Sequence, residues 1–175
     1  MTKELKKRII TSIILFIAAV LLILINKVVF AFAIFIVFFV CFHEWNNINY
    51  KYFKKNKRKL KFIYIQLLGL VYFLFFLISA VTIRMGFENG GIFLIFILCI
   101  CISSDIGGYI FGKTIGGKKL IKISPNKTIS GSVGSFIFSI LPVFFFNFQN
   151  YIDFNFYLSL KNVLFCLIVS LSCQL

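Results

Sequence analysis

The chain alternates between long apolar runs and short polar segments. A helix needs about 20 predominantly apolar residues to cross a bilayer, with a range of about 17–25. The pattern predicts spanning helices at residues 9–25, 28–42 (extendable to Trp45), 62–83, 92–111, 132–148 and 163–175. Pro142 predicts a kink in the fifth helix because proline cannot continue the helical hydrogen bonds. The expected fold class is therefore all-α, a polytopic integral membrane protein with about six transmembrane helices in a single transmembrane domain, residues 1–175.

Composition excludes a soluble globular protein. The chain has 175 residues, of which 61% are hydrophobic and 14% charged, and its mean hydropathy is +1.00. Soluble domains contain about 45–50% apolar residues. The five cysteines, Cys41, Cys99, Cys101, Cys166 and Cys173, all lie in apolar runs, where thiols behave as small hydrophobic groups.

The positive charges are unevenly distributed along the chain. Of the 19 Lys and Arg residues, all except Lys27, Arg84 and Lys161 fall in the N-terminal segment or in the second and fourth loops. Lys and Arg are enriched in cytoplasmic loops, so the N-terminus and these two loops are expected to face the cytoplasm, in a bacterial-type inner or cell membrane. No convincing cleavage site follows the first run, which indicates an uncleaved helix rather than a signal peptide.

One polar region interrupts the apolar chain at residues 104–131, SDIGGYIFGKTIGGKKLIKISPNKTISG. We name it the glycine–lysine segment. Lysines neutralise phosphates, and glycines let backbone N–H groups approach them. A helix that begins near Ser132 would further favour an anion. Asp105 cannot bind a phosphate directly, so its roles are a divalent metal ligand, a partner of a nucleotide hydroxyl, or one half of a structural ion pair.

A formal P-loop pattern, G-x-x-x-x-G-K-T, runs from Gly107 to Thr114. A P-loop connects a strand to a helix, whereas the run before Gly107 is a predicted spanning helix, and Tyr109, Ile110 and Phe111 are bulky. The pattern therefore does not indicate a P-loop.

The spacing in the glycine–lysine segment resembles that of the phosphatidate cytidylyltransferases, also called CDP-diacylglycerol synthases. The matching residues read S-D-x-G-x-Y-x-x-G-K-x-x-G from Ser104 to Gly116, then Lys119, then I-S-P-N-K-T-x-x-G from Ile123 to Gly131. The resemblance implies transfer of CMP from CTP to phosphatidate, with release of pyrophosphate and with Mg²⁺ or another divalent cation as cofactor. The expected partners are CTP, phosphatidic acid and membrane lipids, with a homodimer as an option. No nucleic acid is expected.

The resemblance also implies roles for individual residues. Asp105 and Lys127 would be catalytic, with Asp105 as a metal ligand. Substrate-binding residues would be Ser104, Tyr109, Lys113, Lys119, Ser124, Pro125, Asn126, Thr128 and Gly131. Gly107, Gly112, Gly116 and Gly131 would allow close backbone approach, although small residues also pack membrane helices against one another.

The family's second signature, which begins with G-D and continues to P-G-H-G-G-x-x-D-R, is absent. The chain has five acidic residues. Only Asp105 and Glu44 are expected both to lie on the same side of the membrane as the glycine–lysine segment and to be held in place by the fold. A two-metal site needs several carboxylates. We therefore expect a truncated or split-gene product that is inactive alone, with the missing metal ligands beyond Leu175.

Other interpretations remain open. A CTP-dependent lipid kinase or a prenyl-lipid cytidylyltransferase would use similar residues. A transporter or structural subunit would place polar residues along a mid-membrane path, whereas here they gather at one edge. The basic run from Lys51 to Lys61 is expected to anchor the chain to anionic lipids. His43, beside Glu44 and Trp45, is either an interfacial anchor or an acid–base group.

Overall fold

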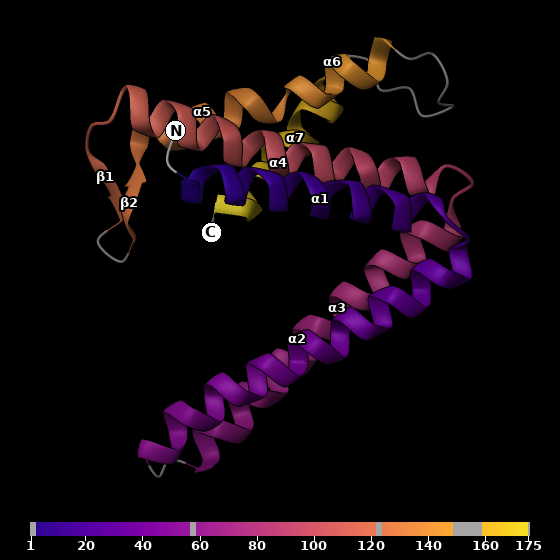
Figure 1. Ribbon diagram of the computed structural model, residues 1–175, viewed down its shortest axis with the longest axis vertical. Coiled ribbons are helices and arrows are strands. Elements are labelled where there is room, and N and C mark those ends of the chain that lie inside the picture. The colour runs from indigo at the N-terminus through magenta and orange to yellow at the C-terminus, as the bar shows by residue number, and fades with distance from the viewer. Residues whose placement is uncertain (1–2, 57–58, 122–123, 149–158, 175) are drawn as a thin grey trace. The chain divides into compact units, whose positions relative to one another are not determined.

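The computed structural model describes residues 3–56, 59–121, 124–148 and 159–174. Within these ranges the chain forms seven helices and one two-stranded hairpin (Figure 1). Four stretches of the described chain are helical, long and apolar enough to cross a membrane, namely 27–52, 60–86, 90–114 and 129–146. The prediction of an all-α integral membrane protein is therefore confirmed, and six spans and their orientation stay predictions. The chain divides into two compact units, Met1–Gly91 and Ile92–Leu175.

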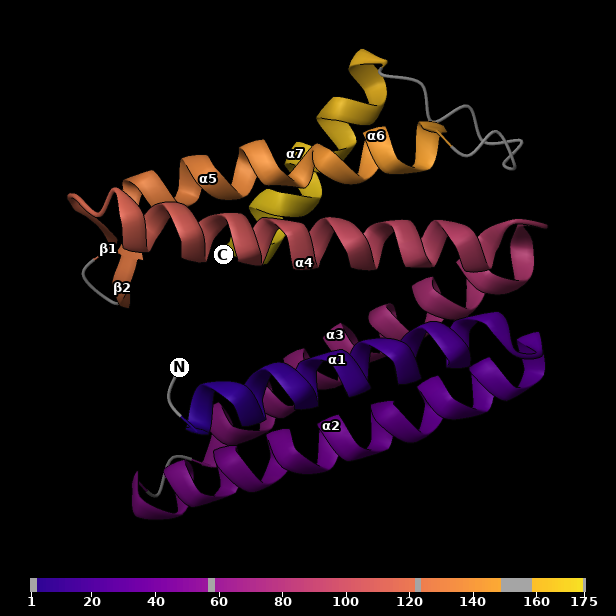
Figure 2. The ribbon, with the colours of Figure 1, turned by 45° about the horizontal axis from the view of Figure 1, so that its top comes forward.

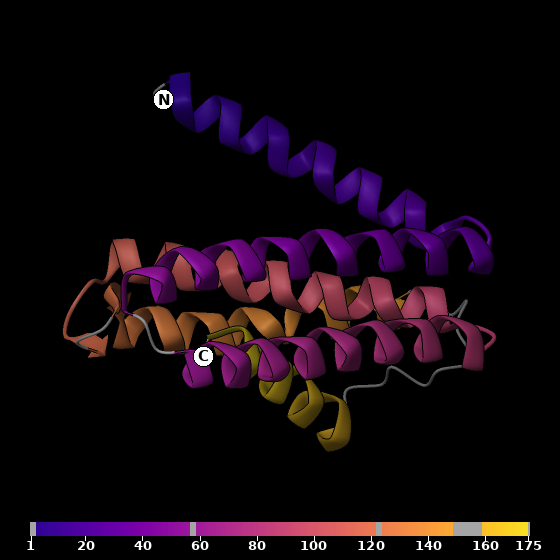
Figure 3. The ribbon, with the colours of Figure 1, turned by 90° about the horizontal axis from the view of Figure 1, so that it is seen from below.

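The first unit consists of three helices: α1 (Lys3–Leu24), α2 (Lys27–Asn56) and α3 (Lys59–Gly86). Helices α2 and α3 lie side by side along their length (Figure 1). Asn26 begins α2, since its side-chain oxygen accepts a hydrogen bond from the N–H of Val28 at 3.1 Å, a typical cap. Helix α1 diverges from α2 with distance from the turn that joins them (Figure 3).

Arg84 closes the end of this unit. It is buried near the C-terminus of α3, and its guanidinium donates to the carbonyls of Ile23 at 2.9 Å and Ile25 at 3.0 Å. These carbonyls belong to the end of α1, where helical partners run out. One arginine therefore satisfies the end of a helix 59 to 61 residues earlier in the chain.

The second unit contains α4 (Gly90–Thr114), α5 (Ile129–Ser139), α6 (Leu141–Phe148) and α7 (Leu160–Gln174). Helices α5 and α6 lie end to end, with a bend between them, and run alongside α4, while α7 crosses beside them (Figure 2). The buried core joins α4, α6 and α7 through Phe96, Ile100, Val143 and Cys166. The apolar faces of three helices thus hold this unit together.

The predicted kink at Pro142 is confirmed as a break between two helices. Helix α5 ends at Ser139 and α6 begins at Leu141, so Pro142 lies in the first turn of α6. Proline is tolerated there because the first turn of a helix has N–H groups without helical partners.

The glycine–lysine segment is less loop-like than predicted. Residues 104–114 belong to α4, and a hairpin of β1 (Lys119–Ile121) and β2 (Ser124–Thr128) follows. The composition of residues 124–128 predicts a rigid turn, because Pro125 and Asn126 favour turns; this prediction is wrong, since these residues pair with β1 as an extended strand. Gly116 and Gly117 have φ of 63° and 105°, which glycine adopts without steric cost, and they turn the chain from α4 into the hairpin.

Candidate functional site

Helices α4 and α5 meet at a seam of glycines. A β-carbon added to Gly107 would lie 2.5 Å from the carbonyl oxygen of Gly134, and one added to Gly134 would lie 2.7 Å from the carbonyl oxygen of Gly107. Such distances leave no room for a side chain on either helix. Gly108 and Gly131 approach in the same way, at 2.9 Å from a β-carbon on Gly131 to the oxygen of Gly108. At these positions the structure favours the helix-packing interpretation of the glycines.

The N-terminus of α5 is fixed by a cap. Helix α5 begins at Ile129, three residues before the predicted start, and Thr128 is its N-cap residue. The Thr128 hydroxyl accepts a hydrogen bond from the N–H of Gly131 at 3.1 Å. The Ser130 hydroxyl donates to the carbonyl of Gly116, which ties this first turn to the end of α4. The positive end of the α5 dipole is therefore held in a defined place.

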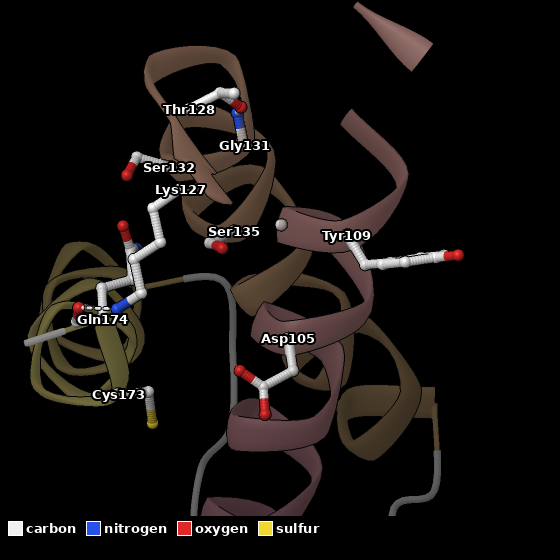
Figure 4. Close-up of a pocket in the computed structure, with 10 residues that line it drawn as sticks. Asp105, Tyr109, Lys127, Thr128, Gly131, Ser132, Ser135, Cys173 and Gln174 are labelled. Atoms are coloured by element: carbon white, nitrogen blue, oxygen red, sulfur yellow. Dashed lines mark hydrogen bonds between the residues drawn. The ribbon is translucent and has the colours of Figure 1, made fainter. Parts of the chain in front are cut away.

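A cavity of about 230 Å³ opens beside this helix end. Its walls come from α4, the end of β2, the start of α5 and the end of α7 (Figure 4). The lining residues are Asp105, Gly108, Tyr109, Lys127, Thr128, Gly131, Ser132, Ser135, Cys173 and Gln174. Five predicted site residues, Asp105, Tyr109, Lys127, Thr128 and Gly131, thus line one cavity.

One carboxylate, of Asp105, and one ammonium group, of Lys127, line the cavity beside the start of α5. Asp105 projects from α4 toward α7, whereas the ring of Tyr109 points away from α7 (Figure 4). The ammonium group of Lys127 donates to the backbone carbonyl of Gln174, at the C-terminus of α7. Helix C-termini carry a partial negative charge that favours a cation. Both ionisable side chains are exposed, so a solute can reach them.

A chain of hydrogen bonds connects α4 to the α7 side of the cavity. The hydroxyl groups of Ser104 and Ser170 lie 2.7 Å apart, and both residues are fully buried. The side-chain amide of Gln174 donates to the Ser170 hydroxyl at 3.2 Å, and the carbonyl of Gln174 receives Lys127. Ser104 therefore connects α4 to α7 and does not line the cavity.

Two other predicted lysines lie outside the cavity lining. The ammonium group of Lys113 donates to the Tyr109 hydroxyl at 3.3 Å and stands 5.5 Å from the centre of its ring, an arrangement that cation–π attraction favours. Lys119 is exposed at the start of β1. Ser124, Pro125 and Asn126 lie in β2, and their side chains lie outside the described part of the structure. The roles of these five residues stay predictions.

Five lining residues were not among the predicted site residues: Gly108, Ser132, Ser135, Cys173 and Gln174. One of them, Ser135, carries a local signal, because it forms a small-x-x-x-small pair with Gly131, a spacing that favours close helix packing. Cys173 and Gln174 have none, since they come from α7 and reach the cavity only through the tertiary fold.

The donor set fits one Mg²⁺ ion better than two. Mg²⁺ is usually bound by one or two carboxylates together with substrate phosphates and waters. Asp105 supplies one carboxylate, with the hydroxyls of Ser132 and Ser135 in the same lining. Among the described residues, no group of three or more His, Cys, Asp or Glu side chains gathers to hold a metal. A single ion held by Asp105 and a bound phosphate is thus compatible with the site.

Parts of the chain are similar to known proteins. The chain is 37% identical over 62 residues to a phosphatidate cytidylyltransferase of Encephalitozoon cuniculi, over 35% of the chain and 16% of that protein. It is 52% identical over 48 residues to a phosphatidate cytidylyltransferase of Chlamydia muridarum, over 27% of the chain and 16% of that protein. The chain thus spans about a sixth of the length of these curated relatives. No solved structure matches it significantly.

The family assignment rests on a longer match. The sequence model of the cytidylyltransferase family matches residues 48–175, well over half of the chain, and this range contains α3 to α7 and every residue that lines the cavity. The chain therefore belongs to the cytidylyltransferase family.

Proposed function

We propose that this chain carries the nucleotide-binding part of a CTP:phosphatidate cytidylyltransferase. One observation supports this best: residues from both halves of the glycine–lysine segment line one cavity at the N-terminus of α5, namely Asp105, Gly108 and Tyr109 from the first half and Lys127, Thr128 and Gly131 from the second. In the proposed reaction a phosphate oxygen of phosphatidate attacks the α-phosphorus of CTP. The bond from that phosphorus to the bridging oxygen breaks, and pyrophosphate leaves with its electron pair.

The triphosphate of CTP is proposed to bind at the α5 end of the cavity. The positive end of the helix dipole and the N–H groups of its first turn favour an anion. Lys127 supplies a full positive charge at the same place, and the Ser132 hydroxyl can donate a hydrogen bond. Such fixed donors stabilise the charge that develops on a departing pyrophosphate without reorganisation.

Asp105 is proposed to hold Mg²⁺ together with the phosphates of CTP. When bound, Mg²⁺ neutralises phosphate charge and orients the phosphate groups. Asp105 suits this role because its side chain is exposed and lines the same cavity as the start of α5. Its carboxylate on its own would repel a phosphate, and a cation bound between the two negative groups would remove that repulsion.

We further propose that this end of the second unit faces the cytoplasm, where CTP is dissolved. The distribution of Lys and Arg supports it, since the glycine–lysine segment contains five lysines and Lys161 stands alone in the next loop. A bacterial-type inner membrane is the proposed location.

Cysteine labelling tests this orientation. A cysteine is introduced in place of the exposed Lys118, and its reaction with a membrane-impermeant maleimide is compared in intact and in opened cells. Labelling in intact cells would contradict it.

Nucleotide binding tests the proposal directly. The purified chain in detergent with Mg²⁺ should bind radiolabelled CTP in preference to ATP, and excess pyrophosphate should displace it. Lys127→Ala should weaken CTP binding at least tenfold, because a charge-assisted contact contributes about 1.5–3 kcal/mol. Lys161→Ala is the matched control, since Lys161 is also exposed but lies outside the cavity lining. Equal affinity of the two variants would overturn the assignment of the cavity.

Turnover is a separate measurement. With Asp105 as the one carboxylate of the described lining, we expect the 175-residue chain to bind CTP without converting labelled phosphatidate to CDP-diacylglycerol. Product formation by this chain alone would contradict that expectation while supporting the reaction. In any active form, Asp105→Asn should abolish turnover, and near-normal turnover would remove Asp105 from the site.

A further inference from the structure

Two thiols approach each other beside the cavity. The sulfur atoms of Cys101 on α4 and Cys173 on α7 lie 3.4 Å apart, although 72 residues separate them in the sequence. Both cysteines are free thiols, and neither is fully buried. The other described cysteines, Cys41, Cys99 and Cys166, have no thiol contact of this kind. The fold thus places one specific pair together out of five cysteines.

One member of the pair lies on the wall of the candidate site. Cys173 lines the cavity itself, and it precedes Gln174, whose carbonyl holds Lys127. Cys101 lies one helical turn before Asp105 and hence on the same face of α4. Cys99 lies two positions away from Cys101, and residues at that spacing do not face each other on a helix.

We propose that Cys101 and Cys173 are a redox-reactive pair that forms a reversible disulfide by exchange with a low-molecular-weight disulfide such as oxidised glutathione. The exposed Cys173 reacts first in this scheme: its thiolate attacks one glutathione sulfur, a mixed disulfide forms, and one glutathione thiolate leaves. The thiolate of Cys101 then attacks the Cys173 sulfur and releases the second glutathione. The two protein thiols lose two protons and two electrons, and one glutathione disulfide becomes two thiols.

Formation of the bond requires only a small movement. A disulfide has a sulfur–sulfur distance of about 2.05 Å, so the two sulfurs must approach by little more than an ångström. In the proposed cross-linked form the end of α7 is tied to α4 one helical turn from Asp105. We expect this to fix the position of Cys173 and Gln174 in the cavity wall.

Mass spectrometry of the full chain tests the proposal without reference to CTP. After incubation with oxidised glutathione and quenching by acid, a peptide that joins Cys101 to Cys173 should appear, and dithiothreitol should remove it. Cys101→Ser should leave Cys173 as a stable glutathione adduct without the cross-link. Cys99→Ala is the matched control and should form the cross-link as the wild type does.

Two results would overturn the proposal. One is a wild-type chain that keeps Cys101 and Cys173 reduced while Cys41 or Cys99 is modified. The other is a Cys173–Cys173 bond between two chains, seen as a dimer on a non-reducing gel. The wild-type measurement needs no substitution, so a variant that fails to fold does not weaken the test.

A consequence for the site rests on the proposed function. If the chain binds CTP as proposed, the cross-linked form should bind it at least threefold more weakly, and dithiothreitol should restore the affinity. Unchanged affinity in a cross-linked sample would overturn this consequence alone. A chain that forms the disulfide but binds no CTP in either state would instead count against the proposed function.

Discussion

The helix pairs α2–α3 and α4–α5 both use glycine, but in opposite ways. Between α2 and α3 a single glycine, Gly69, accommodates a large indole: a β-carbon there would lie 2.7 Å from Cδ1 of Trp45. Between α4 and α5 glycines face glycines, and the two backbones themselves come into contact. The first arrangement fills the space between two helices with a side chain, and the second removes that space.

The difference explains where a polar cavity can form. Close approach of α4 and α5 brings the capped start of α5 and Asp105 into the lining of one cavity. In the α2–α3 pair the Gln66 amide donates a hydrogen bond of 2.9 Å to the Asn46 oxygen, while Oε1 of Gln66 and Nδ2 of Asn49 are buried without a hydrogen-bond partner among the described residues. Glycine on both helices thus builds a site, whereas glycine on one helix builds a packing contact.

The largest effect is expected from Gly134→Leu. A side chain at position 134 meets the Phe111 β-carbon at 2.5 Å and the Gly107 carbonyl at 2.7 Å, and the backbone cannot rotate away as a side chain can. Overpacking costs about 1–3 kcal/mol and occasionally more, so we expect a loss of about 3 kcal/mol or more. The midpoint of thermal unfolding in detergent, followed by circular dichroism, measures it.

The matched control is Gly86→Leu at the end of α3. A β-carbon at Gly86 meets nothing within 4 Å, so the same chemical change should alter the midpoint little. A Gly134→Leu variant as stable as Gly86→Leu would show that the glycine seam is not required for packing.

Arg84→Leu is expected to have the second largest effect. It removes two charge-assisted hydrogen bonds to the end of α1, and hydrogen bonds of this kind contribute about 1.5–3 kcal/mol. We expect a loss of about 2 kcal/mol in the same unfolding assay. Arg84→Lys should be intermediate, because an ammonium group lacks the planar fork that reaches two carbonyls. Equal stability of the lysine variant and the wild type would contradict the proposed geometry.

Gly69→Ala sharpens the comparison because its obstacle is a side chain. Alanine is favoured over glycine in a helix interior by about 0.5–1 kcal/mol, while overlap with the Trp45 indole opposes it. The indole can shift, so the net loss should be about 1 kcal/mol, well below that of Gly134→Leu. The double variant Gly69→Ala/Trp45→Phe should recover part of the loss, and a strictly additive pair would disprove the contact.

The sequence predicted the helices well because their signal is local. Apolar runs gave the positions of α3 and α4 within a few residues, and Pro142 gave the break between α5 and α6. They missed the polar ends of the first two helices, since α1 begins at Lys3 and α2 continues to Asn56. The sequence predicted the hairpin poorly: residues 124–128 carry proline and asparagine, which favour turns, whereas in the structure they pair with β1 as an extended strand. Local propensity could not reveal that pairing.

The candidate site was partly predictable for the same reason. Asp105, Lys127, Thr128 and Gly131 lie in one spaced pattern and were assigned together. Ser104, from the same pattern, faces α7 instead, because Ser170 offers a buried hydroxyl partner. No periodicity in α4 can reveal which residue of a distant helix will lie opposite, so the α7 side of the cavity required the structure.

Ser170→Ala is expected to have the smallest effect, and it tests whether α7 belongs to the site. Hydrogen bonds between membrane helices contribute about 0.6 kcal/mol on average, so loss of the Ser104–Ser170 contact should lower stability by about that amount. Ser170→Thr keeps the hydroxyl and should retain the hydrogen bond if the added methyl group fits.

The Ser170 hydroxyl also accepts a hydrogen bond from the Gln174 amide. Ser170→Ala should therefore loosen Gln174, whose carbonyl accepts the hydrogen bond from Lys127, and change CTP affinity modestly. Ser172→Ala is the control, since the Ser172 hydroxyl donates only to the carbonyl of Ile168 in its own helix at 3.0 Å. Equal CTP affinities for the two alanine variants would separate α7 from nucleotide binding and leave the cavity to α4, β2 and α5.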